Sequence, residues 1–121
     1  MEMNRTVLGK WGEACAAEYL RKKKYRILGA NYHTRFGEID LIAERRNVLI
    51  FVEVKLRKDA AFAEAREFVT QSKQRKLRTS AELWLAAHPT EKPVRFDVIE
   101  IYAPQGAQGP VTIEHLENAF A

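Results

Sequence analysis

The chain has 121 residues, with 20 Lys and Arg against 16 Asp and Glu and a formal net charge of +4. Its only cysteine is Cys15, which excludes an intramolecular disulfide and a cysteine-caged zinc and favours a reducing, cytoplasmic setting. The first residues lack the apolar core of a signal peptide, and no apolar run is long enough to cross a bilayer, so we expect one domain, 1–121, without a membrane role.

The first predicted element is a helix over residues 7–23, in which large apolar side chains recur at helical spacing. A second stripe of small residues would let this helix approach a sheet closely, and Glu13 lies in the middle of that stripe. A carboxylate in such a contact needs a positive partner or a metal. Glu13 is therefore either a surface or ion-paired residue, or part of a site. A strand is expected to follow over residues 25–32.

The next two segments, 38–44 and 48–56, alternate polar and apolar residues as paired strands do. Arg46-Asn47 between them can form a two-residue hairpin turn, although it lacks the glycine that would make the prediction strong. With that turn, the numbers of paired residues sum to 93. The apolar face of the hairpin then consists of Ile39, Leu41, Ile50, Val52 and Val54.

Charged side chains share the other face of this hairpin. The pairing places Asp40 opposite Glu53. It also places Glu38 opposite Lys55. Facing carboxylates repel, so Asp40 and Glu53 need a compensating cation, which is either Lys55 or a metal. Carboxylate oxygens and the Val54 carbonyl are the hard ligands that Mg²⁺ or Mn²⁺ prefers, and the Lys55 ammonium can orient or deprotonate a metal-bound water.

The second half of the chain predicts one helix and two strands. Residues 58–68 have no clean period and are expected to form a loop or a short turn. Thr70 can cap a helix over about 71–87, and strands are expected at 94–102 and 111–116 with a Pro/Gly-rich connection between them.

Two polar residues of this half have structural interpretations. Asp97 is expected to anchor its strand or pair with a basic side chain, and His88 to cap the preceding helix. The sequence contains no P-loop, no serine-hydrolase elbow and no helical pair of zinc-binding histidines.

Basic residues crowd the first turns of the second predicted helix. Positive charge near a helix N-terminus opposes the helix dipole, and this cost favours phosphate contact over solubility alone. The alternative is an ordinary solvated surface. The basic side chains expected to contact nucleic acid are Arg35, Arg57, Lys58, Lys73, Arg75 and Lys76.

The acidic motifs resemble a known signature. Gly37-Glu38-Ile39-Asp40 followed by Glu53-Val54-Lys55 looks like the acid-(x)n-E-x-K pattern of the PD-(D/E)xK nuclease superfamily, with Glu-Ile-Asp where the superfamily name has Pro-Asp. The substitution keeps the ligand and loses only the proline. Over nearly the whole chain the sequence resembles the YraN-like family of small bacterial proteins, through Gly9-x-x-Gly12-Glu13-x-x-Ala16-Ala17, Lys73-Gln74, Arg95-Phe96-Asp97-Val98 and Asn118-Ala119-Phe120.

The resemblance implies an α/β, restriction-endonuclease-like core, with a mixed central sheet of about four to five strands flanked by helices. It implies that Glu13 completes the acidic cluster with Asp40 and Glu53, and that Gln74 or Lys73 steadies the substrate or the attacking water. The likeness of the family to archaeal Holliday-junction resolvases implies branched DNA as substrate and a homodimer, since two scissile strands need two sites.

Three hypotheses follow for the function. The first is a Mg²⁺- or Mn²⁺-dependent endonuclease in which Asp40, Glu53, the Val54 carbonyl and Glu13 hold the metal. The second is a non-catalytic nucleic-acid-binding module with the same fold. The third is a structural network in which Lys55 neutralises the carboxylates, which leaves Asp40 facing Glu53 unexplained. The residues do not separate DNA from RNA, and any binding is expected to follow the phosphate backbone and to depend strongly on salt.

Overall fold

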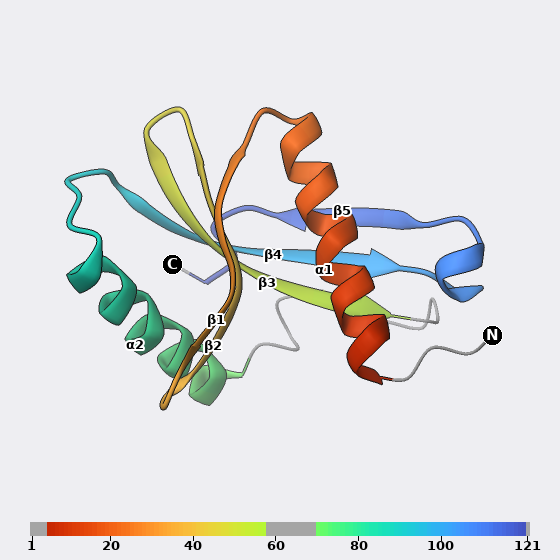
Figure 1. The fold of residues 1–121 in the computed structure, drawn as a ribbon, viewed down its shortest axis with the longest axis horizontal. Coiled ribbons are helices and arrows are strands. Elements are labelled where there is room, and N and C mark those ends of the chain that lie inside the picture. The colour runs from red at the N-terminus through yellow and green to blue at the C-terminus, as the bar shows by residue number, and fades with distance from the viewer. Residues whose placement is uncertain (1–4, 58–69, 121) are drawn as a thin grey trace.

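The computed structural model describes residues 5–57 and 70–120, with side chains described from residue 7 onward. The described elements are two long helices, a short 3₁₀ helix and one mixed five-stranded sheet in the order β1-β2-β3-β4-β5 (Figure 1). This is the α/β architecture expected from the sequence, and it is consistent with a restriction-endonuclease-like core. The elements are α1 (Arg5–Lys22), β1 (Arg26–Thr34), β2 (Gly37–Arg45), β3 (Val48–Arg57), α2 (Gln71–Ala87), β4 (Val94–Tyr102), η2 (Gly106–Gln108) and β5 (Thr112–Leu116).

The β2–β3 hairpin has the predicted register. Its pairs run from Arg45 opposite Val48 to Leu41 opposite Val52, so that the paired numbers sum to 93. Arg46 and Asn47 form the turn with φ of 51° and 64°. Two successive left-handed residues are what a type I′ turn requires, and this turn matches the right-handed twist of the strands. The turn therefore fixes the register although neither residue is glycine.

The two faces of the sheet bury separate apolar clusters. Figure 1 shows α1 lying across β3, β4 and β5, and α2 lying beside the β1–β2 hairpin. Ala16, Ala17 and Leu20 of α1 pack with the cluster that contains Leu41 and Val52. The cluster beneath α2 joins Leu77, Ala81 and Trp84 to Ile42, Phe51 and Val98.

One apolar position of the predicted hairpin face is wrong. Ile39 packs in the cluster beneath α2, whereas Leu41, Ile50 and Val52 pack on the side of α1. The reason is that the β2–β3 pairing described by the structure ends at Leu41. Beyond that point β2 approaches α2, and Thr34 at the hairpin tip lies 2.9 Å from the Ser80 hydroxyl, oxygen to oxygen.

The predicted boundaries hold closely in the second half of the chain. Helix α2 spans the expected residues, and the Thr70 hydroxyl caps it by accepting a hydrogen bond from the Lys73 amide at 3.2 Å. Strand β4 has the expected bounds, while β5 begins one residue later than expected. Strand β1 spans Arg26–Thr34 and so lies slightly beyond its expected range. The predicted loop over 58–68 lies outside the described residues.

Asp97 and His88 have the structural roles expected of them. The fully buried Asp97 carboxylate accepts two hydrogen bonds of 2.8 Å from Arg95, one of 3.0 Å from the Asn118 amide, and lies 2.7 Å from His115 Nε2. Burial works to raise the pKa of Asp97, but these hydrogen bonds outweigh it and hold the pKa below its ordinary value. The His88 amide bonds the last carbonyls of α2. Asp97 thus ties β4 to β5 and to the segment that follows.

Candidate metal centre

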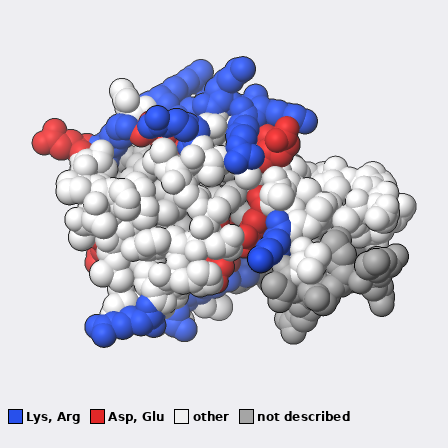
Figure 2. Space-filling model, viewed as in Figure 1, with Lys and Arg blue, Asp and Glu red and all other residues white. Residues whose placement is uncertain are grey.

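A cavity of about 510 Å³ opens between α1, the β1–β2 hairpin, β3 and the first turn of α2. Figure 2 shows acidic side chains gathered in a hollow on this face of the molecule. The charged residues that line the cavity are four carboxylates, Glu13, Glu38, Asp40 and Glu53, and three lysines, Lys55, Lys73 and Lys76.

Asp40 lines the cavity just beyond the last described pair of the β2–β3 ladder. The last described pair of their ladder is Leu41 with Val52, and the next available backbone donor on β3, the Val54 amide, bonds the Asp40 carboxylate instead at 2.8 Å. The amide and the carbonyl of one residue point to the same side of an extended strand. The Val54 carbonyl therefore faces the same side as Asp40, and Val54 lines the cavity.

Three carboxylates converge from two elements. Glu13 of α1 and Glu38 and Asp40 of β2 each offer an oxygen, and these oxygens all lie within 4.8 Å of one another. Glu13 Oε1 is buried and has no hydrogen-bond partner among the described residues. Burial raises the pKa of Glu13, and the negative charges of Glu38 and Glu53 add to this effect against a hydrogen bond from Asn31. Among the described residues, no lysine or arginine forms an ion pair with Glu13 or Asp40.

Asp40 shows the strongest electrostatic conflict in the cavity. Burial and the nearby Glu53 carboxylate together raise its pKa to about 8, while the hydrogen bond from the Val54 amide works in the opposite direction. At neutral pH a proton therefore occupies Asp40 unless another cation takes its place. A divalent cation among the three carboxylates would balance their negative charge, so that Asp40 would no longer need the proton.

Two lysines converge on Glu53, whose side chain is 5% exposed. Lys55 Nζ lies 3.6 Å from Glu53 Oε1, and the Lys73 ammonium forms an ion pair with the same oxygen. Burial and the neighbouring Lys73 lower the pKa of Lys55. For Lys73 burial works to lower the pKa, but the contacts with Glu53 and Lys55 and the charge of Asp40 together outweigh it and raise the pKa. One lysine is thus disposed to lose its proton and the other to keep it.

The donor set of the acidic cluster suits a hard divalent cation. Its atoms are carboxylate oxygens, with the Val54 carbonyl on the same side, and Mg²⁺ and Mn²⁺ prefer such ligands. The unpartnered Glu13 oxygen and the raised pKa of Asp40 both indicate that the negative charge of this cluster is not balanced by nearby positive charge. The residues present therefore fit the metal expected from the sequence.

Most of the predicted site residues meet at this cavity. Glu13, Asp40, Glu53, Val54 and Lys55 line it, and Lys73 and Lys76 line it from α2. Gln74 is half-buried on α2 and is not among the lining residues that the structure describes, so its role stays a prediction.

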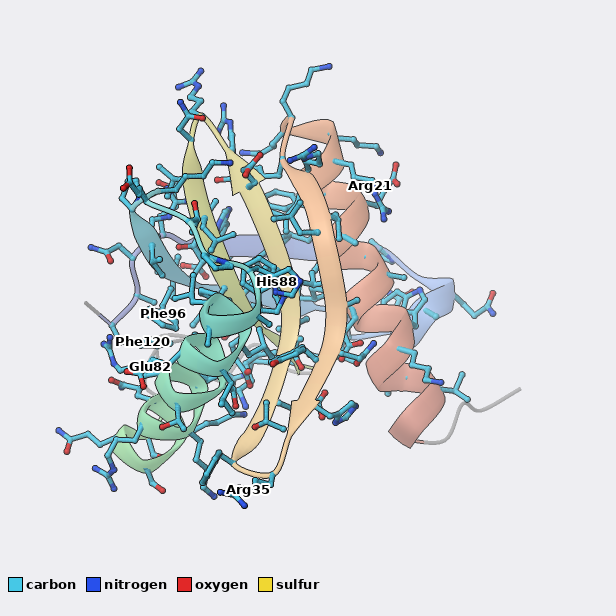
Figure 3. All side chains as sticks on the ribbon, turned by 60° about the vertical axis from the view of Figure 1, so that its left-hand side comes forward. Arg21, Arg35, Glu82, His88, Phe96 and Phe120 are labelled. Atoms are coloured by element: carbon cyan, nitrogen blue, oxygen red, sulfur yellow. The ribbon has the colours of Figure 1, made fainter. Side chains whose placement is uncertain are left out.

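Three further basic residues expected to bind nucleic acid, Arg35, Arg57 and Arg75, are not among the residues that line the cavity. Arg35 is exposed at the tip of the β1–β2 hairpin, with its guanidinium 4.9 Å from the centre of the Phe36 ring (Figure 3). Arg75 is exposed on α2. The Arg57 guanidinium is turned toward the buried Glu100 carboxylate, with Nη1 3.7 Å from Oε2. Lys58 lies outside the described residues.

Sequence reasoning missed Glu38 as a member of the acidic cluster, because it assigned this residue to Lys55 across the strands. The separation of β2 from β3 leaves Glu38 with Glu13 and Asp40 instead, and Glu38 Oε2 lies 3.3 Å from His33 Nδ1. The signal that could have found it was present, since Glu38 and Asp40 are two residues apart on one strand and share a face.

Comparisons with known proteins agree with the likeness found in the sequence. The model of the uncharacterised protein family UPF0102 matches residues 12–101. A UPF0102 protein of Syntrophomonas wolfei is 45% identical over 119 residues, which cover 98% of this chain and all of the relative. UPF0102 proteins of Symbiobacterium thermophilum and Thermodesulfovibrio yellowstonii are 44% and 43% identical, and the matches cover 98% of this chain and 98% and 99% of those relatives. None of the described helices is long and apolar enough to cross a membrane.

Proposed function

The chain belongs to the uncharacterised protein family UPF0102, and from the geometry of its cavity we propose that it is a metal-dependent nuclease that hydrolyses phosphodiester bonds in nucleic acid. The observation that carries the proposal is the convergence of Glu13, Glu38 and Asp40 within 4.8 Å, beside two lysines of opposite pKa shift. A network that served stability alone would not need an unpartnered, buried carboxylate oxygen.

The acidic cluster would hold Mg²⁺ or Mn²⁺. When bound, such an ion supplies Lewis acidity toward the scissile phosphate and lowers the pKa of a coordinated water. Glu13, Glu38 and Asp40 would provide the carboxylate ligands, with the Val54 carbonyl beside them. Glu53 plays a different part, because its carboxylate holds both lysines in the cavity.

The two lysines can divide the proton chemistry. A lowered pKa increases the fraction of Lys55 that is neutral, so its Nζ can accept a proton from the attacking water. A raised pKa keeps Lys73 charged, so its ammonium can offset the negative charge that develops on the phosphate. Both nitrogens contact one carboxylate, which keeps them at the same end of the cavity.

The substrate class is suggested by what surrounds the cluster. Thr70, Ser72 and Lys73 line the cavity at the beginning of α2, where backbone amides and the helix dipole favour an anion. Lys76 lines the cavity one helical turn later, and Arg75 is exposed beside it. A phosphate at this end of α2 would therefore meet both the helix N-terminus and basic side chains.

A cleavage assay tests the proposal. Labelled four-way junction, flap, duplex, single-stranded DNA and RNA are incubated with Mg²⁺, Mn²⁺ or EDTA. Asp40→Asn should abolish metal-dependent cleavage, whereas Glu82→Gln, which removes one carboxylate from the exposed face of α2, should cleave as wild type does. Cleavage that survives Asp40→Asn, or that proceeds equally in EDTA, would refute the assignment.

One contact favours the alternative of a non-catalytic binding module. The Lys73 ammonium already neutralises Glu53, so part of the cavity's charge is balanced without a metal. This alternative predicts nucleic-acid binding without cleavage by wild type, and a wild-type protein that gains no thermal stability from Mg²⁺ or Mn²⁺.

A further inference from the structure

A second charged surface lies at the other end of the β2–β3 hairpin from the cavity. Figure 2 shows basic side chains along the upper end of the molecule, where Figure 1 places the α1–β1 connection and the β2–β3 turn. These two segments meet in space, because the Arg45 guanidinium lies 5.2 Å from the centre of the Tyr25 ring. We call this surface the basic end, and it consists of Arg21, Lys22, Lys23, Lys24, Arg45 and Arg46.

The basic end carries more positive charge than the whole chain. Its six cations exceed the net charge of +4, so the remaining residues together are formally −2. Lys22 pairs with Glu18 at 3.9 Å, and the other five have no carboxylate partner among the described residues. Glu44, the nearby acid on β2, forms ion pairs with Arg26 and Lys92 instead. The surface is therefore open to a polyanion.

Two of these cations occupy backbone positions that favour a different residue. Lys24 follows α1 with φ of 71°, and Arg46 begins the β2–β3 turn with φ of 51°. Glycine or asparagine is preferred at a helix end and in a type I′ turn of this kind. A basic side chain at both positions lowers local stability relative to glycine or asparagine. Because these two residues destabilise the fold locally, their positive charges point to a role outside folding.

We propose that the basic end binds the phosphate backbone of a nucleic-acid duplex whose scissile phosphate lies at the acidic cavity. The inference rests on the proposed nuclease function and names the form of its substrate. Figure 2 shows the acidic hollow and the basic side chains on the same face of the molecule. Because the cavity has more carboxylates than lysines, affinity for a polyanion must come from outside it.

The separation of the two surfaces fits a duplex. Asp40 and Arg45 are five residues apart on β2, which corresponds to about 17 Å at about 3.3 Å per residue. Backbone charges on one strand of a duplex follow each other every 3.4 Å along its axis, so a duplex that lies along β2 would bring phosphates about five base pairs from the cavity to the basic end. A duplex is stiff over this length and holds those phosphates in place, whereas a single strand would have to be ordered on binding.

The test is the salt dependence of binding by Lys24→Gly combined with Arg46→Gly. Glycine suits both left-handed positions, so this variant should fold and melt close to wild type. The matched control is Gln105→Glu combined with Gln108→Glu, which lowers the net charge equally on two exposed residues of the β4–β5 connection. Binding of labelled duplex DNA, duplex RNA and single-stranded DNA is followed by fluorescence anisotropy in EDTA, between 50 and 300 mM salt.

Each lost phosphate contact should reduce the slope of log K against log salt by about 0.9, and should weaken duplex binding about 8-fold at 0.1 M salt. We expect a slope about 1.8 shallower for the glycine variant, a slope unchanged for the control, and a smaller effect with single-stranded DNA. The binding measured with duplex RNA shows whether the basic end also binds an A-form backbone. A glycine variant that matches wild type in slope and affinity, or a control that loses as much, would overturn the proposal.

The two proposals fail separately. If wild type cleaves duplex in Mg²⁺ but the glycine variant binds unchanged in EDTA, the nuclease stands and the basic end has no role in binding. If wild type cleaves no substrate with either metal but the slope changes as expected, the nuclease fails and the basic end stands as a duplex-binding surface.

Discussion

Asp40 should make the metal-free protein less stable as the pH rises, and Asp40→Asn should remove that effect. The pKa of Asp40 is raised from 3.8 to about 8 in the folded protein. A raised folded-state pKa means that the folded protein binds this proton more tightly than the unfolded chain does. Its stabilising effect is complete below pH 3.8 and is lost progressively as the pH rises through about 8.

The magnitude follows from the size of that shift. About four pKa units at about 1.4 kcal/mol each give an upper bound of about 6 kcal/mol lost between pH 4 and pH 8. Counter-ions and water that enter the cavity reduce this figure, and half of it is still a large share of a typical free energy of unfolding of 5–15 kcal/mol. The amide of Asn stays neutral throughout, and its oxygen can still accept the hydrogen bond from the Val54 amide.

The assay is thermal unfolding of wild type, Asp40→Asn and Glu82→Gln in EDTA from pH 5 to pH 9. At about 4 °C per kcal/mol for a domain of this size, the melting temperature of wild type should fall by about 10 °C more than that of Asp40→Asn. Glu82→Gln should follow wild type, because Glu82 is exposed on α2. Adding Mg²⁺ at pH 8 should then raise the melting temperature of wild type and leave Asp40→Asn unchanged. An Asp40→Asn variant that is less stable than wild type at pH 8 in EDTA would refute the reasoning.

Three further variants separate the roles of the site from those of the core. Lys55→Ala should lower the cleavage rate at least about 100-fold, as expected for loss of a general base. Calorimetry should show that the variant binds metal about as tightly as wild type. Weakened metal binding would contradict the role of Lys55 as a general base. Glu13→Gln should weaken Mg²⁺ binding and yet raise the melting temperature in EDTA at pH 8, because it removes the negative charge of a carboxylate whose buried Oε1 has no hydrogen-bond partner among the described residues. A lower melting temperature would show that Glu13 is a structural residue. Asp97→Ala should cost about 3–5 kcal/mol of stability, measured by urea unfolding, because it leaves Arg95 and His115 without their buried partner. A loss below about 1 kcal/mol would show that this network contributes little.

The parts of the site that local rules govern could be predicted from the sequence. A two-residue turn at Arg46-Asn47 fixes the β2–β3 register as far as Leu41 and Val52. The two-residue spacing of Glu38 and Asp40 on one strand predicts that they share a face, and the structure brings them together. Thr70 marks the beginning of α2 because a hydroxyl before a helical pattern caps it. Glu13 could be singled out because a carboxylate on a stripe of small residues conflicts with burial.

Contacts made by tertiary packing could not be predicted in the same way. Where β2 leaves β3 depends on the Asp40–Val54 hydrogen bond and on the packing of the hairpin tip against Ser80, neither of which has a sequence period. The approach of Lys73 to Glu53 depends on where α2 docks. Basic residues also look alike in a sequence, so the burial of Arg57 against Glu100 could not be told from exposure at Arg35.

The hydrogen bond between the Val54 amide and Asp40 gives the protein its own spectroscopic probe. An amide proton bonded to a carboxylate changes its chemical shift when that carboxylate gains a proton or binds a cation. Amides of the regular β3–β4 pairing, such as Ile99, bond to backbone partners and serve as internal references. A nitrogen–proton correlation spectrum recorded against pH, and then against Mg²⁺, would therefore follow the charge state of the cavity from a single resonance without any added label near the site.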